Sequence, residues 1–239
     1  MTNEELYTFQ VRPYFRAPHM YLSFPNRINS RRRILSNEEL KALDIDARLD
    51  CSEADTSIHD SLIMISRDGM NFDIPTKDAF LRPGFDRRNW DNRNQYLHNG
   101  MIQTAPNELS LYFNRHGFSR SAPSTTHFMR CTVRVDGFAS INSPHSGGEF
   151  LTKPLIFEGR GLEVNYETSA TGSIGVELQD TSGKPIEGFR LVESDLLIGD
   201  EVSRPVTWGG SGDVSALQDR PVRILFKMKD ADLYSFRFA

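Results

Sequence analysis

The sequence is short of cysteine and of long apolar runs, and each shortage excludes a class of protein. Among 239 residues there are two cysteines, Cys51 and Cys131. They either pair or, as the sequence favours, remain two isolated buried thiols. No cysteine and histidine cluster has the spacing of a zinc site, and no segment reaches the roughly 18 apolar residues that span a membrane. The sequence therefore predicts no metal, no cofactor and no contact with a membrane.

An excess of charge of one sign is also missing. The formal net charge is −4, which gives no electrostatic basis for binding nucleic acid or an anionic membrane surface. The basic run at residues 31–33 is short and is expected to be a solvated loop. The acidic N-terminus lacks the apolar segment of a signal peptide. We expect a soluble protein, and its compartment stays open.

The residues that are present describe an ordinary globular chain. Hydrophobic residues make up 38% and charged residues 25%, with 16 phenylalanines, a composition that can bury a core. The length suits one large or two ordinary domains.

The stretch at residues 58–69 gives the clearest local pattern. The apolar run from Leu62 to Ile65 predicts a buried strand, and Asp68-Gly69 predicts a hairpin turn with a return at residues 70–72. Asp60 stands where the strand begins, and a carboxylate there needs water, a partner or a substrate. We expect the first half of the chain to be arranged around this hairpin.

Other strands of the first half fall into two groups. Strands are predicted at 19–24, 97–104, 108–114 and 126–135, with a short helix at 36–43 that has an N-capping signal. Short strands joined by hairpins recur at about 16–76 and 93–142, each with the order of a propeller blade.

The pattern changes after Ser143-Pro144-His145-Ser146-Gly147-Gly148, a cluster of Pro, Ser and Gly residues that predicts a domain boundary. The sequence predicts domains at 1–145 and 146–239. Seven alternating segments in the second are typical of an antiparallel β-sandwich. They are 150–157, 161–168, 172–179, 188–191, 204–208, 222–229 and 233–238.

Several motifs together resemble a family. Residues 14–19, Asp60 with 66–69, 82–84 and 92–94 resemble the later blades of a five-bladed β-propeller. They are similar to a group of uncharacterised bacterial proteins related to glycoside hydrolase family 32. Residues 148–155, 176–180 and 228–236 look like the C-terminal β-sandwich of that group.

The resemblance implies an all-β fold, with a partial five-bladed propeller of about two to three blades followed by an antiparallel β-sandwich. It implies a carbohydrate-directed, glycoside-hydrolase-like protein. Members of the group look about twice as long as this chain, and the blade that carries their nucleophile has no counterpart here. The chain therefore resembles an incomplete catalytic domain that is inactive alone. The alternatives are a non-catalytic carbohydrate-binding or structural module, and a module that self-associates or pairs with missing blades through an open propeller edge.

Candidate site residues concentrate at strand ends in the first half, as on rigid scaffolds that carry sites. Asp60 is the candidate catalytic acid, or else it only pairs with Arg16 or Arg67. Trp90 either stacks on a sugar or packs between blades, and Glu149 is expected to bridge the two domains. The candidate substrate-binding residues are Arg16, His19, Arg67, Arg82, Asp91, Arg93, Asn94, Arg115 and His116.

Overall fold

The computed structural model describes residues 4–29, 32–43, 57–90, 95–116 and 127–239. The chain divides into two compact units, Met1–Val133 and Arg134–Ala239. Residues 134–145 group with the second unit, because strand β10 (Ile141–Ser143) pairs with strand β14 (Arg223–Phe238). The assignment of domains to 1–145 and 146–239 stays a prediction.

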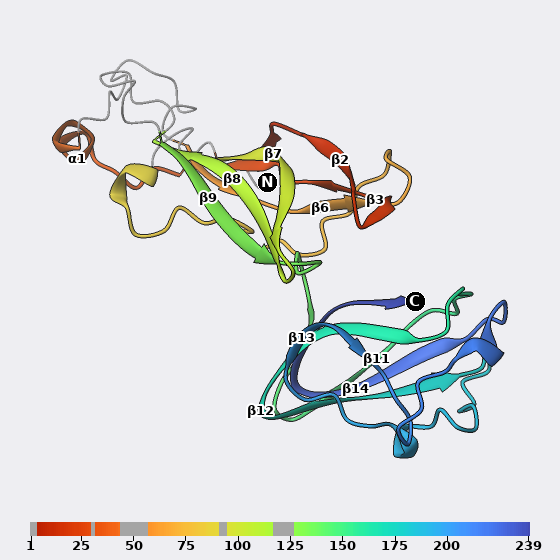
Figure 1. Cartoon of the computed structure of the whole chain (residues 1–239). Helices are drawn as coiled ribbons and strands as arrows, with labels where there is room; N and C mark the ends of the chain where they lie inside the picture. Colours follow the sequence, from red (N-terminus) through yellow and green to blue (C-terminus); the bar gives the residue numbers. More distant parts are fainter. Residues whose placement is uncertain (1–3, 30–31, 44–56, 91–94, 117–126) are drawn as a thin grey trace. The chain divides into compact units, whose positions relative to one another are not determined.

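The described residues of the first unit form three sheets of three strands each. The first holds β1 (Glu4–Tyr7), β4 (Asn26–Asn29) and β5 (Ile58–Ser61); the second holds β2 (Val11–Tyr14), β3 (Ala17–Ser23) and β6 (Met64–Ser66); the third holds β7 (Gln95–Ala105), β8 (Glu108–Arg115) and β9 (His127–Arg134). Figure 1 shows β7, β8 and β9 side by side. Small sheets of this kind are the blades of a partial propeller.

The single strand predicted through Leu62–Ile65 is in fact the junction of two strands. β5 pairs with β4, β6 pairs with β3, and Leu62–Ile63 lies between them, buried. The opposing chain contains Pro25, which has no N–H to give to a ladder, although its carbonyl accepts from the Leu62 N–H at 3.0 Å. The apolar run is therefore buried as predicted, but it crosses from one sheet to the next.

The turn predicted at Asp68-Gly69 is present. Gly69 has φ +73°, and the Asp68 carboxylate accepts the backbone N–H groups of Met70 and Asn71 at 2.8 Å each. The predicted return strand at 70–72 is wrong, because the chain rejoins only through an isolated bridge between Ile65 and Asp73. The backbone N–H groups of Met70 and Asn71 donate to the Asp68 side chain, so they are not available to pair with another strand.

Two other local predictions are confirmed. β7 and β8 form an antiparallel hairpin whose turn is at Pro106-Asn107. Helix α1 (Asn37–Ala42) begins after Ser36 with a capping box, in which the Ser36 hydroxyl and the Glu39 carboxylate each accept the other's backbone N–H. This pairing satisfies two N–H groups that a helix start otherwise leaves open.

The second unit is one five-stranded sheet. It comprises β10, β11 (Gly148–Leu151), β12 (Leu162–Gln179), β13 (Asp200–Pro205) and β14. β12 and β14 are antiparallel along nearly their whole length, with a register shift between Thr168 and Ser173. Both strands curve (Figure 1). The sequence predicted two strands in place of β12, at 161–168 and 172–179, and two in place of β14, at 222–229 and 233–238. The strands bend at the register shift and continue beyond it, so each pair forms one long strand.

The curled sheet encloses one apolar core. Alternate residues of the long strands, among them Val164, Val176 and Phe226, have no exposed surface. Trp208 closes the core, and its indole N–H donates to the Val176 carbonyl at 2.8 Å. The predicted fold class is confirmed, since the chain is all-β, with a partial propeller followed by an antiparallel, sandwich-like unit whose single sheet curls around its core. Among the described residues, no helix is both long and apolar enough to cross a membrane.

Candidate functional site

Asp60, the candidate acid, lies on β5 directly opposite Arg27 of β4. Arg27 donates Nε–H to Asp60 Oδ1 at 2.8 Å and binds Oδ2 through Nη2. It also donates from Nη1 to the Lys77 carbonyl at 2.8 Å. The two side chains are about one-fifth exposed, at 21% for Asp60 and 18% for Arg27. Asp60 is therefore held by a fork of two donors, from an arginine other than the two that the sequence suggested.

The other predicted residues are spread over the first unit. Arg16, His19, Arg67 and Arg82 are exposed, each at a different turn or strand. Asp91, Arg93 and Asn94 lie outside the described residues.

Arg115, by contrast, ends strand β8, and His116 follows it beside a polar loop, residues 83–90. The loop is tied to itself: the Asp86 carboxylate accepts the Arg88 N–H at 3.1 Å, and the Trp90 indole donates to the Gly84 carbonyl at 2.8 Å. Just before the loop, an isolated bridge pairs Leu81 with Ser61 of β5. The half-buried Trp90 ring is thus fixed in place, which fits either of its two predicted roles.

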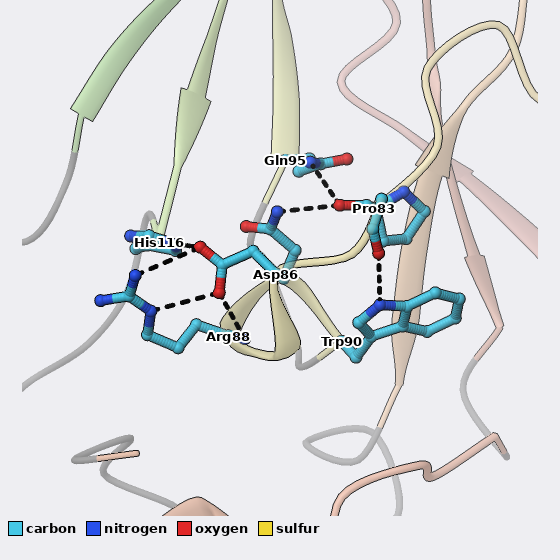
Figure 2. Close-up of polar contacts among 8 residues, drawn as sticks. Pro83, Asp86, Arg88, Trp90, Gln95 and His116 are labelled. Atoms are coloured by element: carbon cyan, nitrogen blue, oxygen red, sulfur yellow. Dashed lines mark hydrogen bonds and ion pairs between the residues drawn. The ribbon is translucent and has the colours of Figure 1, made fainter.

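Asp86 is the centre of a charged cluster (Figure 2). Its carboxylate contacts His116 Nε2 at 2.9 Å and the Arg88 guanidinium at 3.2 Å. Burial raises the pKa of Asp86, but the hydrogen bonds from Arg88 and His116 outweigh burial and lower it to about 2. His116 is buried and has φ +55°, a conformation that few residues other than glycine adopt. The backbone therefore bends sharply to point this ring at Asp86.

Beside this cluster lie buried polar atoms that have no hydrogen-bond partner among the described residues. Asn89 and Gln95 donate their amide N–H groups to the Pro83 carbonyl at 2.8 and 3.4 Å, while Asn89 Oδ1 and Gln95 Oε1 accept nothing. Arg115 stands directly opposite Gln95 across the β7–β8 pair, and its Nε–H also has no partner. Leaving such a group unpaired costs about 1–3 kcal/mol. One donor, on Arg115, and two acceptors, on Asn89 and Gln95, are therefore open among the described residues.

We name Asp86, Arg88, Asn89, Gln95, Arg115 and His116 the loop-83 cluster. Sequence reasoning found Arg115 and His116 and missed the rest. Asp86 carried one usable signal, since an aspartate before Arg87-Arg88-Asn89 suits the cap of a short 3₁₀ turn, which it forms. Gln95 carried none, because its role depends on a partner strand.

The chemistry available to the cluster is hydrogen bonding with a small excess of positive charge, from two arginines and one carboxylate. Asp86 is offset by Arg88, and the open atoms come from amides and a guanidinium, groups that suit hydroxyls. Within the described part of the chain, no three His, Cys, Asp or Glu side chains are grouped as metal ligands. Cys131 on β9 is a free, half-buried thiol, and Cys51 lies outside the described residues.

Comparison with known proteins gives little. No protein-family model matches the chain, and no curated protein matches it at a significant level. Among solved structures, a glycoside hydrolase family 43 arabinoxylan arabinofuranohydrolase from Bacillus subtilis, in complex with cellotetraose, is 11% identical with a TM-score of 0.26. The match covers 96% of this chain and 53% of that one. The chain spans about half the length of that protein, and so distant a likeness assigns no activity.

Proposed function

We propose that this chain is a carbohydrate-directed part of a glycoside-hydrolase-like protein, related to glycoside hydrolase family 32, and that alone it binds sugar without cleaving it. The observation that carries the proposal is the loop-83 cluster. A sugar hydroxyl both donates and accepts a hydrogen bond, so one hydroxyl can satisfy the Arg115 donor and the Gln95 acceptor together. Arg115 as a whole is half-buried, but its Nε and Gln95 Oε1 are themselves buried, so side chains of the cluster must shift before a hydroxyl reaches them.

The test is a titration of the full chain with neutral oligosaccharides of three to four units, covering several sugars and linkages, followed by isothermal calorimetry. At least one is expected to bind, and Gln95→Leu is expected to weaken it about 5- to 10-fold, the effect of about 1 kcal/mol from one lost hydrogen bond. Gln103→Leu, an exposed glutamine on the same strand, is the matched control and keeps full affinity. A panel in which no sugar binds would refute the proposal.

Catalysis by Asp60 is the second candidate, and its geometry supports it in one respect. Arg27 fixes the carboxylate in a single orientation, as a group that flanks a glycosidic bond requires. The ion pair with Arg27 also limits the use of Asp60 as an acid, because the pair must open before the carboxylate can exchange a proton.

We therefore expect no hydrolysis of aryl glycosides by this chain. In a longer protein that supplies the missing blades, Asp60→Asn is expected to abolish hydrolysis while circular dichroism shows an unchanged fold. Normal turnover in that variant would remove Asp60 from the mechanism.

A further inference from the structure

The outer face of the second unit's sheet has a depression of about 580 Å³. This volume falls within the roughly 300–1,000 Å³ typical of small-molecule sites. It is lined by three strands, β11, β12 and β14, and by the loop after β12. It lies wholly within the second unit and involves none of the loop-83 cluster.

The strand register places two lysines on this face. Along β14, Phe226 and Met228 point into the core, so Lys227 and Lys229 between and after them point outward. Lys227 is directly opposite Glu149 of β11 on one side. On the other side β12 places Gly175 opposite Lys227 and Ser173 opposite Lys229.

Gly175 makes the floor of the depression. A side chain at this position would enter the space, since a Cβ there would lie 3.0 Å from Leu191 Cδ1 and 3.5 Å from Leu196 Cδ2. The two leucines thus close over the glycine and form an apolar wall. Leu196 is 59% exposed, so part of this wall is open to a ligand.

The charge of the depression favours an anion. Two ammonium groups face one carboxylate, Glu149, which leaves an excess of one positive charge on this face. Among the described residues, Lys227, Lys229 and Glu149 form no ion pair. A ligand carboxylate can therefore bind the lysines without first displacing a protein partner.

We propose that this depression is a second binding site, for an acidic sugar such as a short chain of uronic acid residues. The choice of a sugar rests on the proposed function. The anionic character rests on the two lysines alone. Lys227 and Lys229 bind the carboxylates, the Ser173 hydroxyl and the Glu149 carboxylate bind sugar hydroxyls, and Leu191 and Leu196 contact the apolar C–H faces of the rings.

The experiment is calorimetric titration of the full chain with trigalacturonic acid and, separately, with its methyl ester. The acid is expected to bind at least 10-fold more tightly than the neutral ester and to weaken as salt rises from 50 to 300 mM. Lys227→Gln with Lys229→Gln is expected to lower the affinity at least 10-fold. Lys153→Gln removes an exposed lysine outside the depression and is expected to change nothing.

Gly175→Ala is an independent variant that keeps both lysines and fills the floor. It is expected to weaken the acid several-fold while thermal unfolding stays close to that of the parent chain, since the atoms it meets are flexible side-chain ends. Equal binding of acid and ester would overturn the anionic site. Equal binding of a hexaglutamate peptide would overturn the assignment to a sugar.

The two proposals fail separately. Gln95→Leu is expected to weaken neutral sugars at the loop-83 cluster and leave trigalacturonic acid unaffected, whereas the lysine variants do the reverse. If the unchanged chain binds trigalacturonic acid but no neutral sugar, the result counts against the proposed function only.

Discussion

At the scale of single residues, Asp86 gives the firmest prediction because its partners are well defined. Its side chain is 27% exposed and is bonded by Arg88 and His116. The pKa of Asp86 in the fold, about 2, lies below the 3.8 expected when unfolded. Ionised Asp86 therefore stabilises the fold above about pH 4, and this contribution is lost as the pH falls toward 2.

Asp86→Asn removes that titration. The variant is expected to be less stable than the parent by about 1 kcal/mol at pH 5, a value reduced for partial exposure, and the gap should close by pH 2. Urea unfolding at several pH values between 5 and 2 measures it. A gap that stays constant over this range would show that Asp86 does not act through its charge.

Asp60 shows what a sequence can say about a site. Asp60 was recognisable because it stands at the head of an apolar run. Its partner Arg27 was not, because it lies 33 residues away and is brought opposite only by the β4–β5 register. Gln95 and Arg115 meet in the same manner across β7 and β8. Cross-strand partners are the part of a site that local patterns leave undetermined.

At the scale of elements, the bend in the long strands of the second unit depends on Gly172. A Cβ there would lie 2.2 Å from the Asp230 carbonyl oxygen and 2.8 Å from that of Lys229. Both are backbone atoms and cannot turn aside. The two strands approach this closely because β12 shifts register between Thr168 and Ser173.

Gly172→Ala is therefore expected to lower the free energy of unfolding by at least about 2 kcal/mol. Gly161→Ala is the matched control, since a Cβ at Gly161 meets nothing within 4 Å, and it should change stability by less than about 0.5 kcal/mol. Guanidinium unfolding of both variants provides the measurement. Equal stability of the two would mean that the bend does not require glycine.

Elements were predictable from the sequence where a local signal marks their ends. The hairpin turn at Pro106-Asn107 and the cap at Ser36 are such cases. Two of the errors share one cause: where a strand begins or ends depends on the opposing chain. Pro25 splits the ladder facing Leu62–Ile63, and continuous pairing with β14 fuses two predicted strands into β12.

At the scale of the whole molecule, the architecture changes along the chain, while the division into domains at residues 145 and 146 stays a prediction. Three small sheets come first, and the rest of the chain belongs to one curled sheet. The boundary of the second compact unit lies earlier, at Arg134, because β10 is an outer strand of that sheet. A turn-rich segment of Pro, Ser and Gly signals a break in patterning, but such segments also join strands of one sheet.

The second unit contains everything that an independent domain needs. Every residue of its buried core cluster lies between Phe157 and Leu233. Arg134, the first residue of the unit, is bonded within it, to Asn165 at 2.6 Å and to the Tyr166 carbonyl at 3.0 Å. A core that draws on no residue outside the unit should be stable by itself.

We therefore expect residues 134–239, produced alone, to fold and to unfold cooperatively, with amide NMR shifts that match those of the same residues in the full chain. A fragment starting at residue 146 is the informative comparison, because it lacks β10 and Arg134. It should be less stable, since loss of β10 exposes one edge of β14 and Asn165 loses its bonds to Arg134 and to the Val135 carbonyl. If the shorter fragment were as stable as the longer one, the structural boundary would lie at 146 and not at Arg134.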